Sequence, residues 1–200
     1  MSKRYDRAYF DRWYRHPRRR VDSPAALART VHFVVGMAEH VLGRPLRSVL
    51  DVGCGEGRWY PVLRRLRPRL RYLGVDPSPY AVGRFSRQRP LVHGSVGTLD
   101  TLPLDGPYDL VVCCDVLHYV SLPDLRRGLP ALAAQVAGLA YLSLYTSADA
   151  IEGDLGGLRR RTPATYRRLL GAAGLVPCGM HCYLPRAAAG DLAALERPGR

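Results

Sequence analysis

The chain has 200 residues, of which 47% are hydrophobic and 24% are charged. This length and balance are ordinary for one globular domain and exclude a wholly disordered chain. Its 20 glycines and 16 prolines follow no three-residue period, which excludes a collagen-like chain. The apolar stretches are too short to span a bilayer, and residues 1–20 lack the apolar core of a secretory signal. We therefore expect a cytoplasmic domain, monomeric or homodimeric, with no membrane partner.

The formal net charge of +13 raises the question of a polyanionic partner such as RNA. Only Lys3, however, is a lysine among the 30 basic residues, and alanine, glycine and proline are abundant. Such a joint bias is what a GC-rich coding sequence produces, whatever the protein does. The arginines are also spread along the chain, with runs at 18–20 and 159–161. Nucleic acid is therefore the less favoured partner.

The five cysteines do not form a pattern typical of a disulfide framework. Cys178 and Cys182 flank His181, but no second pair of ligands at zinc spacing accompanies them. We therefore expect reduced thiols and no bound metal.

Two helical segments are expected ahead of residue 46. In the first, Tyr5, Tyr9 and Trp13 recur every four residues and form an aromatic stripe. Such a stripe is typical of packing, but beside a cofactor loop it also fits a lid. The second helix is expected to begin after Ser23, an N-cap residue, and to end at Gly43.

From residue 47 onward, short β-branched runs alternate with helical stretches, the pattern of a parallel sheet flanked by helices. Strands are expected over 48–52, 72–76, 91–93, 108–114 and 139–145, with helices over 57–66, 79–88 and 124–136 between them. A helix over 163–173 then leads to a last strand over 175–184. Because no β-branched run follows residue 184, a sheet of six strands is as compatible with the sequence as one of seven.

The most informative segment is a glycine loop that follows the first strand. Gly53, Gly55 and Gly57 let the backbone turn sharply and approach a ligand closely. Asp76 ends the next strand, where an acid can accept both ribose hydroxyls of an adenosine cofactor. A dinucleotide fingerprint would place its third glycine at position 58, which is Arg58, and no Gly-Lys-Ser/Thr of a P-loop is present.

Residues 51–57 resemble the cofactor loop of the class I S-adenosylmethionine-dependent methyltransferases, and residues 74–78, 108–120 and 162–175 resemble that family's later motifs in the same order. The resemblance covers residues 47–184. It implies an α/β, three-layer Rossmann-like methyltransferase fold with a mostly parallel sheet. It also implies S-adenosylmethionine as cofactor and S-adenosylhomocysteine as product. One domain is expected, with a lid segment over 1–45, a core over 46–184 and a tail over 185–200.

The resemblance also implies which residues bind the cofactor. These are Asp51, Gly53, Cys54, Gly55, Gly57, Asp76, Pro77, Ser95, Val96 and Cys114. Ser95 departs from the family, which often has an acid there to contact the adenine amino group. From the aromatic stripe we add Tyr5, Tyr9 and Trp13 as a cover over the cofactor, because aromatic faces suit a sulfonium cation.

The implied chemistry is a direct displacement that needs alignment and exclusion of water. Asp115 and His118 follow the fourth strand at the ligand-binding edge and are the candidate catalytic groups, with His118 as a general base. Tyr145 and Asp149 follow the fifth strand and are placed to line an acceptor pocket. The prolines typical of enzymes that methylate base amino groups are missing from residues 114–117.

A small-molecule acceptor with an oxygen or nitrogen nucleophile is therefore the favoured substrate. Two alternatives stay open. One is a methyltransferase acting on RNA or another polyanion, which the net charge supports. The other is a protein that binds the adenosyl cofactor without catalysis, because a fold does not fix a function.

Overall fold

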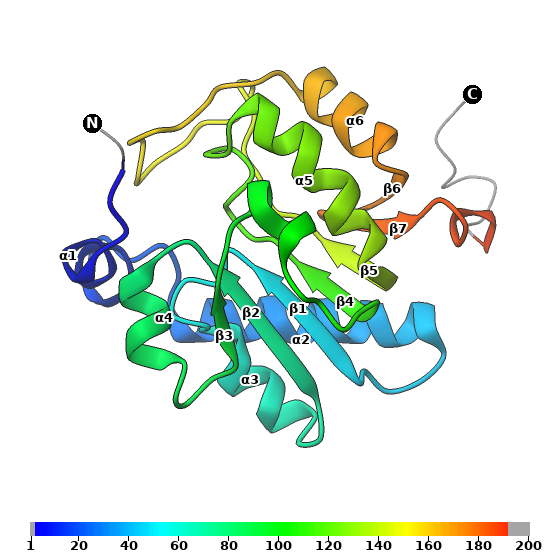
Figure 1. Ribbon diagram of the computed structural model, residues 1–200, viewed down its shortest axis with the longest axis horizontal. Coiled ribbons are helices and arrows are strands. Elements are labelled where there is room, and N and C mark those ends of the chain that lie inside the picture. Colours follow the sequence, from blue (N-terminus) through cyan, green and yellow to red (C-terminus); the bar gives the residue numbers. More distant parts are fainter. Residues whose placement is uncertain (1–2, 192–200) are drawn as a thin grey trace.

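A seven-stranded sheet lies between two layers of helices in the computed structural model, which describes residues 3–191 (Figure 1). The strands are β1 (Ser48–Val52), β2 (Arg71–Asp76), β3 (Leu91–His93), β4 (Tyr108–Val112), β5 (Val136–Tyr141), β6 (Leu175–Gly179) and β7 (Cys182–Pro185). Their order is β3-β2-β1-β4-β5-β7-β6, and β7 runs antiparallel to both of its neighbours. The chain therefore winds outward in both directions from β1 and β4, which leaves a ligand-binding crevice at their carboxyl ends.

The two central strands are buried along their whole length, as their nearly continuous apolar sequences predict. Their few polar groups are satisfied. Asp109 of β4 accepts hydrogen bonds of 2.9 and 2.7 Å from both terminal nitrogens of Arg44, and its backbone N–H donates to Ser48 Oγ of β1 at 3.0 Å. These bonds hold the loop before β1 against β4.

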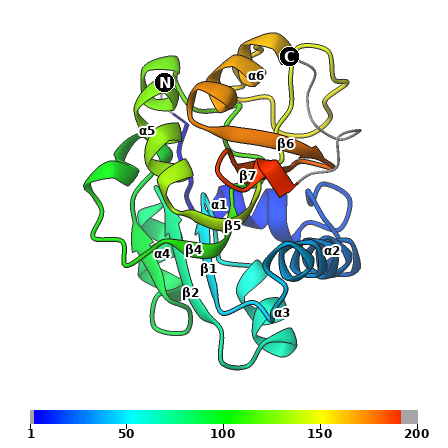
Figure 2. The same ribbon diagram turned by 90° about the vertical axis from the view of Figure 1, so that its right-hand side faces the viewer.

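The helices are α2 (Pro24–Leu42), α3 (Trp59–Leu66), α4 (Pro79–Phe85), α5 (Leu122–Ala134) and α6 (Pro163–Ala172). Helices α2 and α3 cover one face of the sheet, whereas α5, α6 and the short helix η2 (Val96–Thr101) cover the other (Figure 2). Four of the five begin alike. Ser23, Ser78, Ser121 and Thr162 each accept a hydrogen bond from a backbone N–H of the first turn, and a proline lies in that turn.

The expected last strand over 175–184 is instead a hairpin of β6 and β7, so the option of six strands is wrong and that of seven is confirmed. The chain turns at Gly179, Met180 and His181, whose φ values are 93°, 49° and 63°. Two successive residues with positive φ match the right-handed twist of a hairpin, but they are usually Asn or Gly. A methionine and a histidine gave no turn signal in the sequence.

The N-terminal segment lies beyond the carboxyl ends of the strands, at the same end of the molecule as the connection between β5 and α6 (Figure 1). It contains α1 (Arg7–Phe10), which continues as a π-helical turn over Asp11–Arg15. Phe10 is 1% exposed and stacks on Tyr80 of α4, with ring centroids 5.7 Å apart. Ser78 Oγ donates to the Tyr5 carbonyl at 2.5 Å. The segment is thus fixed to the core at several points.

Among residues 3–191, no helix combines the length and the apolar character that crossing a membrane requires.

Two helical glycines predict opposite effects on stability. A Cβ on Gly128 of α5 would overlap the Val96 carbonyl oxygen, so Gly128→Ala should lower the free energy of unfolding by about 1–3 kcal/mol. A Cβ on Gly36 of α2 would meet nothing within 4 Å, so Gly36→Ala should raise it by up to about 1 kcal/mol. Urea unfolding of both variants checks this, and equal effects would contradict the close packing of α5 on η2.

Candidate functional site

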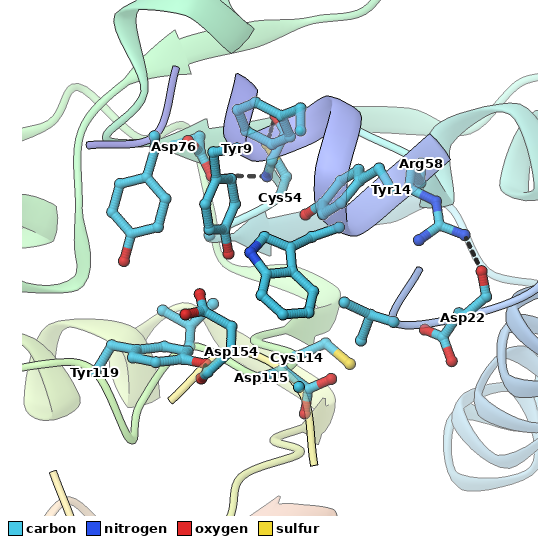
Figure 3. Close-up of a pocket in the computed structure, with 18 of the residues that line it drawn as sticks. Tyr9, Tyr14, Asp22, Cys54, Arg58, Asp76, Cys114, Asp115, Tyr119 and Asp154 are labelled. Atoms are coloured by element: carbon cyan, nitrogen blue, oxygen red, sulfur yellow. Dashed lines mark hydrogen bonds between the residues drawn. The ribbon is translucent and has the colours of Figure 1, made fainter. Parts of the chain in front are cut away.

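A cavity of about 750 Å³ lies at the carboxyl edge of the sheet (Figure 3). Its walls come from three parts of the chain that are distant in sequence. The N-terminal segment lines it from residue 5 to residue 22, the ends of β1, β2 and β4 form its base, and residues 151–154 complete it. The topology explains the location, because the crevice between β1 and β4 is where the chain reverses its winding.

Nearly all of the residues predicted to bind the cofactor line this one cavity. They are Tyr5, Tyr9, Trp13, Asp51, Gly53, Cys54, Gly55, Asp76, Pro77, Ser95, Val96 and Cys114, and the catalytic candidates Asp115 and His118 line it as well. Gly57 is the exception and does not line the cavity. A Cβ on Gly57 would face the side chains of Leu91, Arg89 and Tyr72, so this glycine serves the packing of the loop on the sheet.

The glycine loop and Asp76 form one hydrogen-bonded unit. Gly53 and Gly55 have φ values of 76° and 56°, which only glycine adopts without strain. The backbone N–H of Gly55 donates to Asp76 Oδ2 at 2.7 Å, and that of Ser78 donates to Oδ1 at 2.8 Å. A Cβ on Gly53 would overlap the Val116 side chain and one on Gly55 would overlap the Tyr14 hydroxyl, so the cradle that the loop forms packs closely on both and admits only glycine.

Two carboxyl groups are buried below this cradle. Asp51 is 2% exposed, and Tyr72 Oη donates to its Oδ2 at 2.8 Å. Burial and, to a lesser extent, the charge of Asp76 raise the pKa of Asp51 to about 7, although the hydrogen bond from Tyr72 opposes the shift. Burial also raises the pKa of Asp76. An acidic, desolvated cradle of this kind fits a ligand that carries ribose hydroxyls and a positive charge.

Asp115 follows β4 in a left-handed conformation, with φ of 57°. Its backbone N–H donates to the Ser143 carbonyl at 2.9 Å, and Ser143 Oγ donates to its Oδ1 at 2.9 Å. Burial raises the pKa of Asp115. An aspartate that faces a cavity and whose pKa is raised accepts a proton more readily than an ordinary carboxylate does.

His118 is 1% exposed, and its Nδ1 accepts a hydrogen bond from the backbone N–H of Tyr145 at 3.3 Å. Burial, followed by the charge of Lys3, lowers the pKa of His118 to about 4. The neutral ring that this contact implies carries its proton on Nε2. His118 is therefore placed to donate a hydrogen bond and is poorly suited to the role of general base.

Several cavity residues were not predicted. Tyr119 adjoins His118, and Tyr14 adjoins the aromatic stripe, so both lay beside sequence signals. Asp154 lies in a connection without periodicity, and no sequence signal marks it. Tyr145 lines the cavity as expected, whereas Asp149 does not and instead caps its own turn by accepting from Thr146 N at 2.7 Å.

Arginines gather at the part of the cavity formed by the N-terminal segment. Arg12, Arg18, Arg19 and Arg20 are exposed and line it, and none of them forms an ion pair with another of the residues between 3 and 191. Arg58 differs, because it donates to the Asp22 carbonyl at 3.2 Å and lies over the Tyr14 ring at 5.1 Å. Exposed positive charge of this kind attracts anions to this part of the cavity.

No disulfide joins any of the five cysteines, all of which lie among the described residues. Within the part of the chain that the structure describes, no group of three His, Cys, Asp or Glu side chains lies close enough together to hold a metal ion.

A glycine cradle at the switch point of a Rossmann-like sheet, with an acid at the end of β2, defines a domain that binds an adenosyl cofactor. A family model described as a methyltransferase domain matches residues 50–137. This match shows that the core of the chain is similar to the S-adenosylmethionine-dependent methyltransferases that the sequence resembles, and the similarity indicates S-adenosylmethionine as the cofactor. Both expectations from the sequence, and the expected fold class, are confirmed.

Two curated relatives are trans-aconitate 2-methyltransferases. That of Deinococcus radiodurans is 30% identical over 158 residues, which are 66% of this chain and 60% of that protein. That of Methylobacterium nodulans is 31% identical over 140 residues, which are 68% of this chain and 53% of that protein. The chain thus spans little more than half the length of these relatives.

Solved structures of the same fold include two enzymes that methylate sugars. An amino pentose methyltransferase from Micromonospora echinaspora, with S-adenosylmethionine bound, has a TM-score of 0.63 at 16% identity and covers 82% of this chain and 91% of that one. A sugar N-methyltransferase from a Streptoalloteichus species has a TM-score of 0.60 at 22% identity, with 88% and 85% covered. At these identities the likeness concerns the fold alone.

The low pKa of His118 predicts a pH-dependent part of the stability. The unfolded chain holds the ordinary pKa of 6.5, so it binds more protons than the folded chain between pH 6.5 and about 4. This part of the stability is fully present above pH 6.5 and is lost as the pH falls toward 4. Urea unfolding at pH 7 and pH 4.5 should show a smaller acid-induced loss in His118→Asn than in the parent protein.

His32→Asn, at an exposed position of α2, is the matched control and should leave the acid-induced loss unchanged. NMR titration of the His118 ring checks the same assignment directly. A midpoint above pH 6 would contradict the buried neutral state.

Proposed function

We propose that this protein transfers a methyl group from S-adenosylmethionine to a small-molecule acceptor held in the same cavity. The observation that carries the proposal is that the cradle, the catalytic candidates and the N-terminal segment all line one space. Its volume of about 750 Å³ lies within the range of small-molecule sites. The cofactor and a small acceptor would bind side by side in this cavity.

The residues present fit the cofactor. Asp76 still has lone pairs for the ribose hydroxyls, and Ser95 and Val96 lie along the wall expected to face the adenine. Gly53 and Gly55 line the cavity near the buried carboxyl of Asp51 and would take the amino-acid end of the cofactor once the Tyr14 hydroxyl, which packs on Gly55, moves aside. When bound, S-adenosylmethionine supplies an electrophilic methyl group on a sulfonium.

This chain's own residues would then align the acceptor and exclude water. Tyr5, Tyr9 and Trp13 face the cavity from the N-terminal segment and would cover it as a lid. Asp115, whose pKa burial raises, would accept the acceptor's proton. His118 would orient the acceptor by donating from Nε2, in place of the role as a base that its position suggested.

A second candidate is an anionic acceptor. Arg12 and Arg18–Arg20 support it, as does the similarity to the trans-aconitate 2-methyltransferases, since aconitate is a carboxylic acid. For RNA, binding would weaken steeply with rising salt, with a slope that reports the number of phosphates contacted. A small acid would show a much shallower dependence, so a salt titration separates the two.

Asp76 is the first test of the cofactor site. Asp76→Ala should weaken binding of S-adenosylhomocysteine by about 1.5–3 kcal/mol, or roughly ten- to a hundredfold, because a charged acceptor of hydrogen bonds is lost. Isothermal calorimetry measures the change. Asp100→Ala removes an exposed acid outside the cavity and should have no effect. Equal affinities for the two variants, or preferential binding of NAD to the parent, would contradict the site.

The covering role of the N-terminal segment has its own test. The chain has two tryptophans, Trp13 and Trp59, so Trp59→Phe leaves Trp13 as the fluorescent probe. Binding of S-adenosylhomocysteine should then protect Trp13 from quenching by acrylamide. Trp13→Ala should weaken this binding about three- to tenfold through the lost aromatic contact.

Deletion of residues 1–15 should weaken binding further, but it also exposes the surface under Phe10 and lowers the melting temperature. Trp13→Ala is therefore the variant that decides whether the segment covers the cofactor, because Trp13 is only half-buried and its loss disturbs the core less than the deletion does. Unchanged quenching and unchanged affinity would show that the segment merely packs on the core.

A further inference from the structure

Three tyrosines and one aspartate that line the cavity surround an ammonium group. Lys3 Nζ lies 3.6 Å from the ring centroid of Tyr119, 5.2 Å from that of Tyr5 and 5.4 Å from that of Tyr9. It also forms an ion pair with the Asp154 carboxylate. The carboxylate of Asp154 lies between the rings of Tyr9 and Tyr119 (Figure 3). We call these four surrounding residues the tyrosine cage.

The tyrosine cage is built from both sides of the cavity. Tyr5 and Tyr9 belong to the N-terminal segment, whereas Tyr119 follows β4 and Asp154 precedes α6. Tyr119 Oη donates to the Asp154 carbonyl at 2.7 Å, which fixes the two core residues to each other. The side chains of Lys3 and Asp154 are only 18% and 14% exposed, so the ammonium is largely desolvated. Desolvation is the condition under which cation–π contacts are strongest.

We propose that the tyrosine cage is the site for the amino group of a small amine acceptor, and that Lys3 occupies it while the acceptor is absent. This inference rests on the proposed methyl transfer and names its substrate class. The bound side chain is itself a primary ammonium on an alkyl stem, so the structure already shows that the cage accommodates this chemistry.

The direction in which charge moves during the reaction explains why an amine suits the cage. The nitrogen lone pair forms the new N–C bond, the electron pair of the breaking C–S bond stays on sulfur, and one N–H proton passes to a carboxylate or to water. Positive charge therefore grows on the nitrogen. Aromatic faces and a carboxylate around that nitrogen stabilise the transition state more than the neutral amine.

The amine must first lose its proton in order to attack. Burial lowers the pKa of Lys3, although the hydrogen bond and charge of Asp154 oppose the shift. An acceptor amine in the same surroundings would lose its proton more readily than in water. For an amine held in the cage, Asp154, which pairs with the ammonium, would take this proton in place of Asp115.

Two other ligands fit the cage less well. A carboxylate would face both Asp154 and the negative faces of three rings. The cofactor's sulfonium loses its charge in the transition state, so a carboxylate beside it would stabilise the reactant and slow the reaction. The exposed arginines lie outside the cage and do not change its preference for an amine.

The experiment vacates the cage and measures binding of a probe that cannot be methylated. Tetramethylammonium chloride is titrated into the full chain by calorimetry, with sodium chloride holding the ionic strength constant. Lys3→Ala should bind the probe about tenfold more tightly than the parent, because the competing ammonium is gone. Arg4→Ala is the matched control, since it removes the same charge from an exposed neighbouring position and leaves the cage filled.

In the Lys3→Ala background, Tyr119→Leu should abolish the increase in affinity for tetramethylammonium. Tyr119→Phe should keep that increase because the ring remains. Sodium acetate, used as a second probe, should not compete. The proposal is wrong if Lys3→Ala still binds S-adenosylhomocysteine but its affinity for tetramethylammonium rises no more than that of Arg4→Ala. It is also wrong if acetate binds and Tyr119→Leu removes that binding. A parent protein that does not bind S-adenosylhomocysteine overturns the proposed function and the amine site with it.

A separate measurement tests whether the cage binds the cofactor's sulfonium instead of an amine. If Tyr119→Leu weakened S-adenosylmethionine but not S-adenosylhomocysteine, while tetramethylammonium bound nowhere, the cage would serve the cofactor and the amine assignment would be wrong.

Discussion

A single chain of hydrogen bonds joins the parts of this site. It runs from the Gly55 N–H through the Asp76 carboxylate to the Ser78 N–H. Ser78 Oγ then accepts from Ala81 N, which caps α4, and donates its one proton to the Tyr5 carbonyl. The glycine loop, the end of β2, the start of α4 and the N-terminal segment therefore share one buried network. Because every donor in it is used, a change at any member is felt by the others.

The aromatic N-terminal segment serves two environments at once. Tyr5, Tyr9 and Trp13 line the cavity, whereas Phe10 is buried against Tyr80. The segment thus lines the cavity with one face and packs its other face on α4. Packing on the core and lining the cavity are therefore compatible, and the covering role of the segment stays a prediction.

Local patterns predicted the parts of this protein that depend on neighbours in sequence. Local sequence is enough to predict the buried strands β1 and β4, from their apolar runs, and the helix starts, from Ser-Pro or Thr-Pro. The turn at Met180 and His181 did not, because its conformation is imposed by the pairing of β7 with β5 and β6. No local preference of these two residue types reveals it.

The residues of the site likewise fall into those that local spacing predicts and those that it does not. Gly53, Gly55 and Asp76 follow from spacing, since adjacent parallel strands bring their carboxyl ends together. The pKa of His118 depends on burial and on the charge of Lys3, more than a hundred residues away, and spacing cannot report either. Asp154 meets the N-terminal segment only through the tertiary fold. Side chains whose role depends on such distant partners lay beyond sequence reasoning.

The attachment of the N-terminal segment also determines how a ligand can enter. Its contacts with the core include the Phe10–Tyr80 stack, the bond from Ser78 to Tyr5, and the Arg15–Glu56 and Lys3–Asp154 ion pairs. None of these involves the hydrophobic layers beneath α2 and α5. Detachment of this segment is therefore a local unfolding step with a free energy well below that of global unfolding. The amides of α1 would exchange their hydrogens with solvent long before those of β1, and the rate of ligand exchange would follow that local equilibrium.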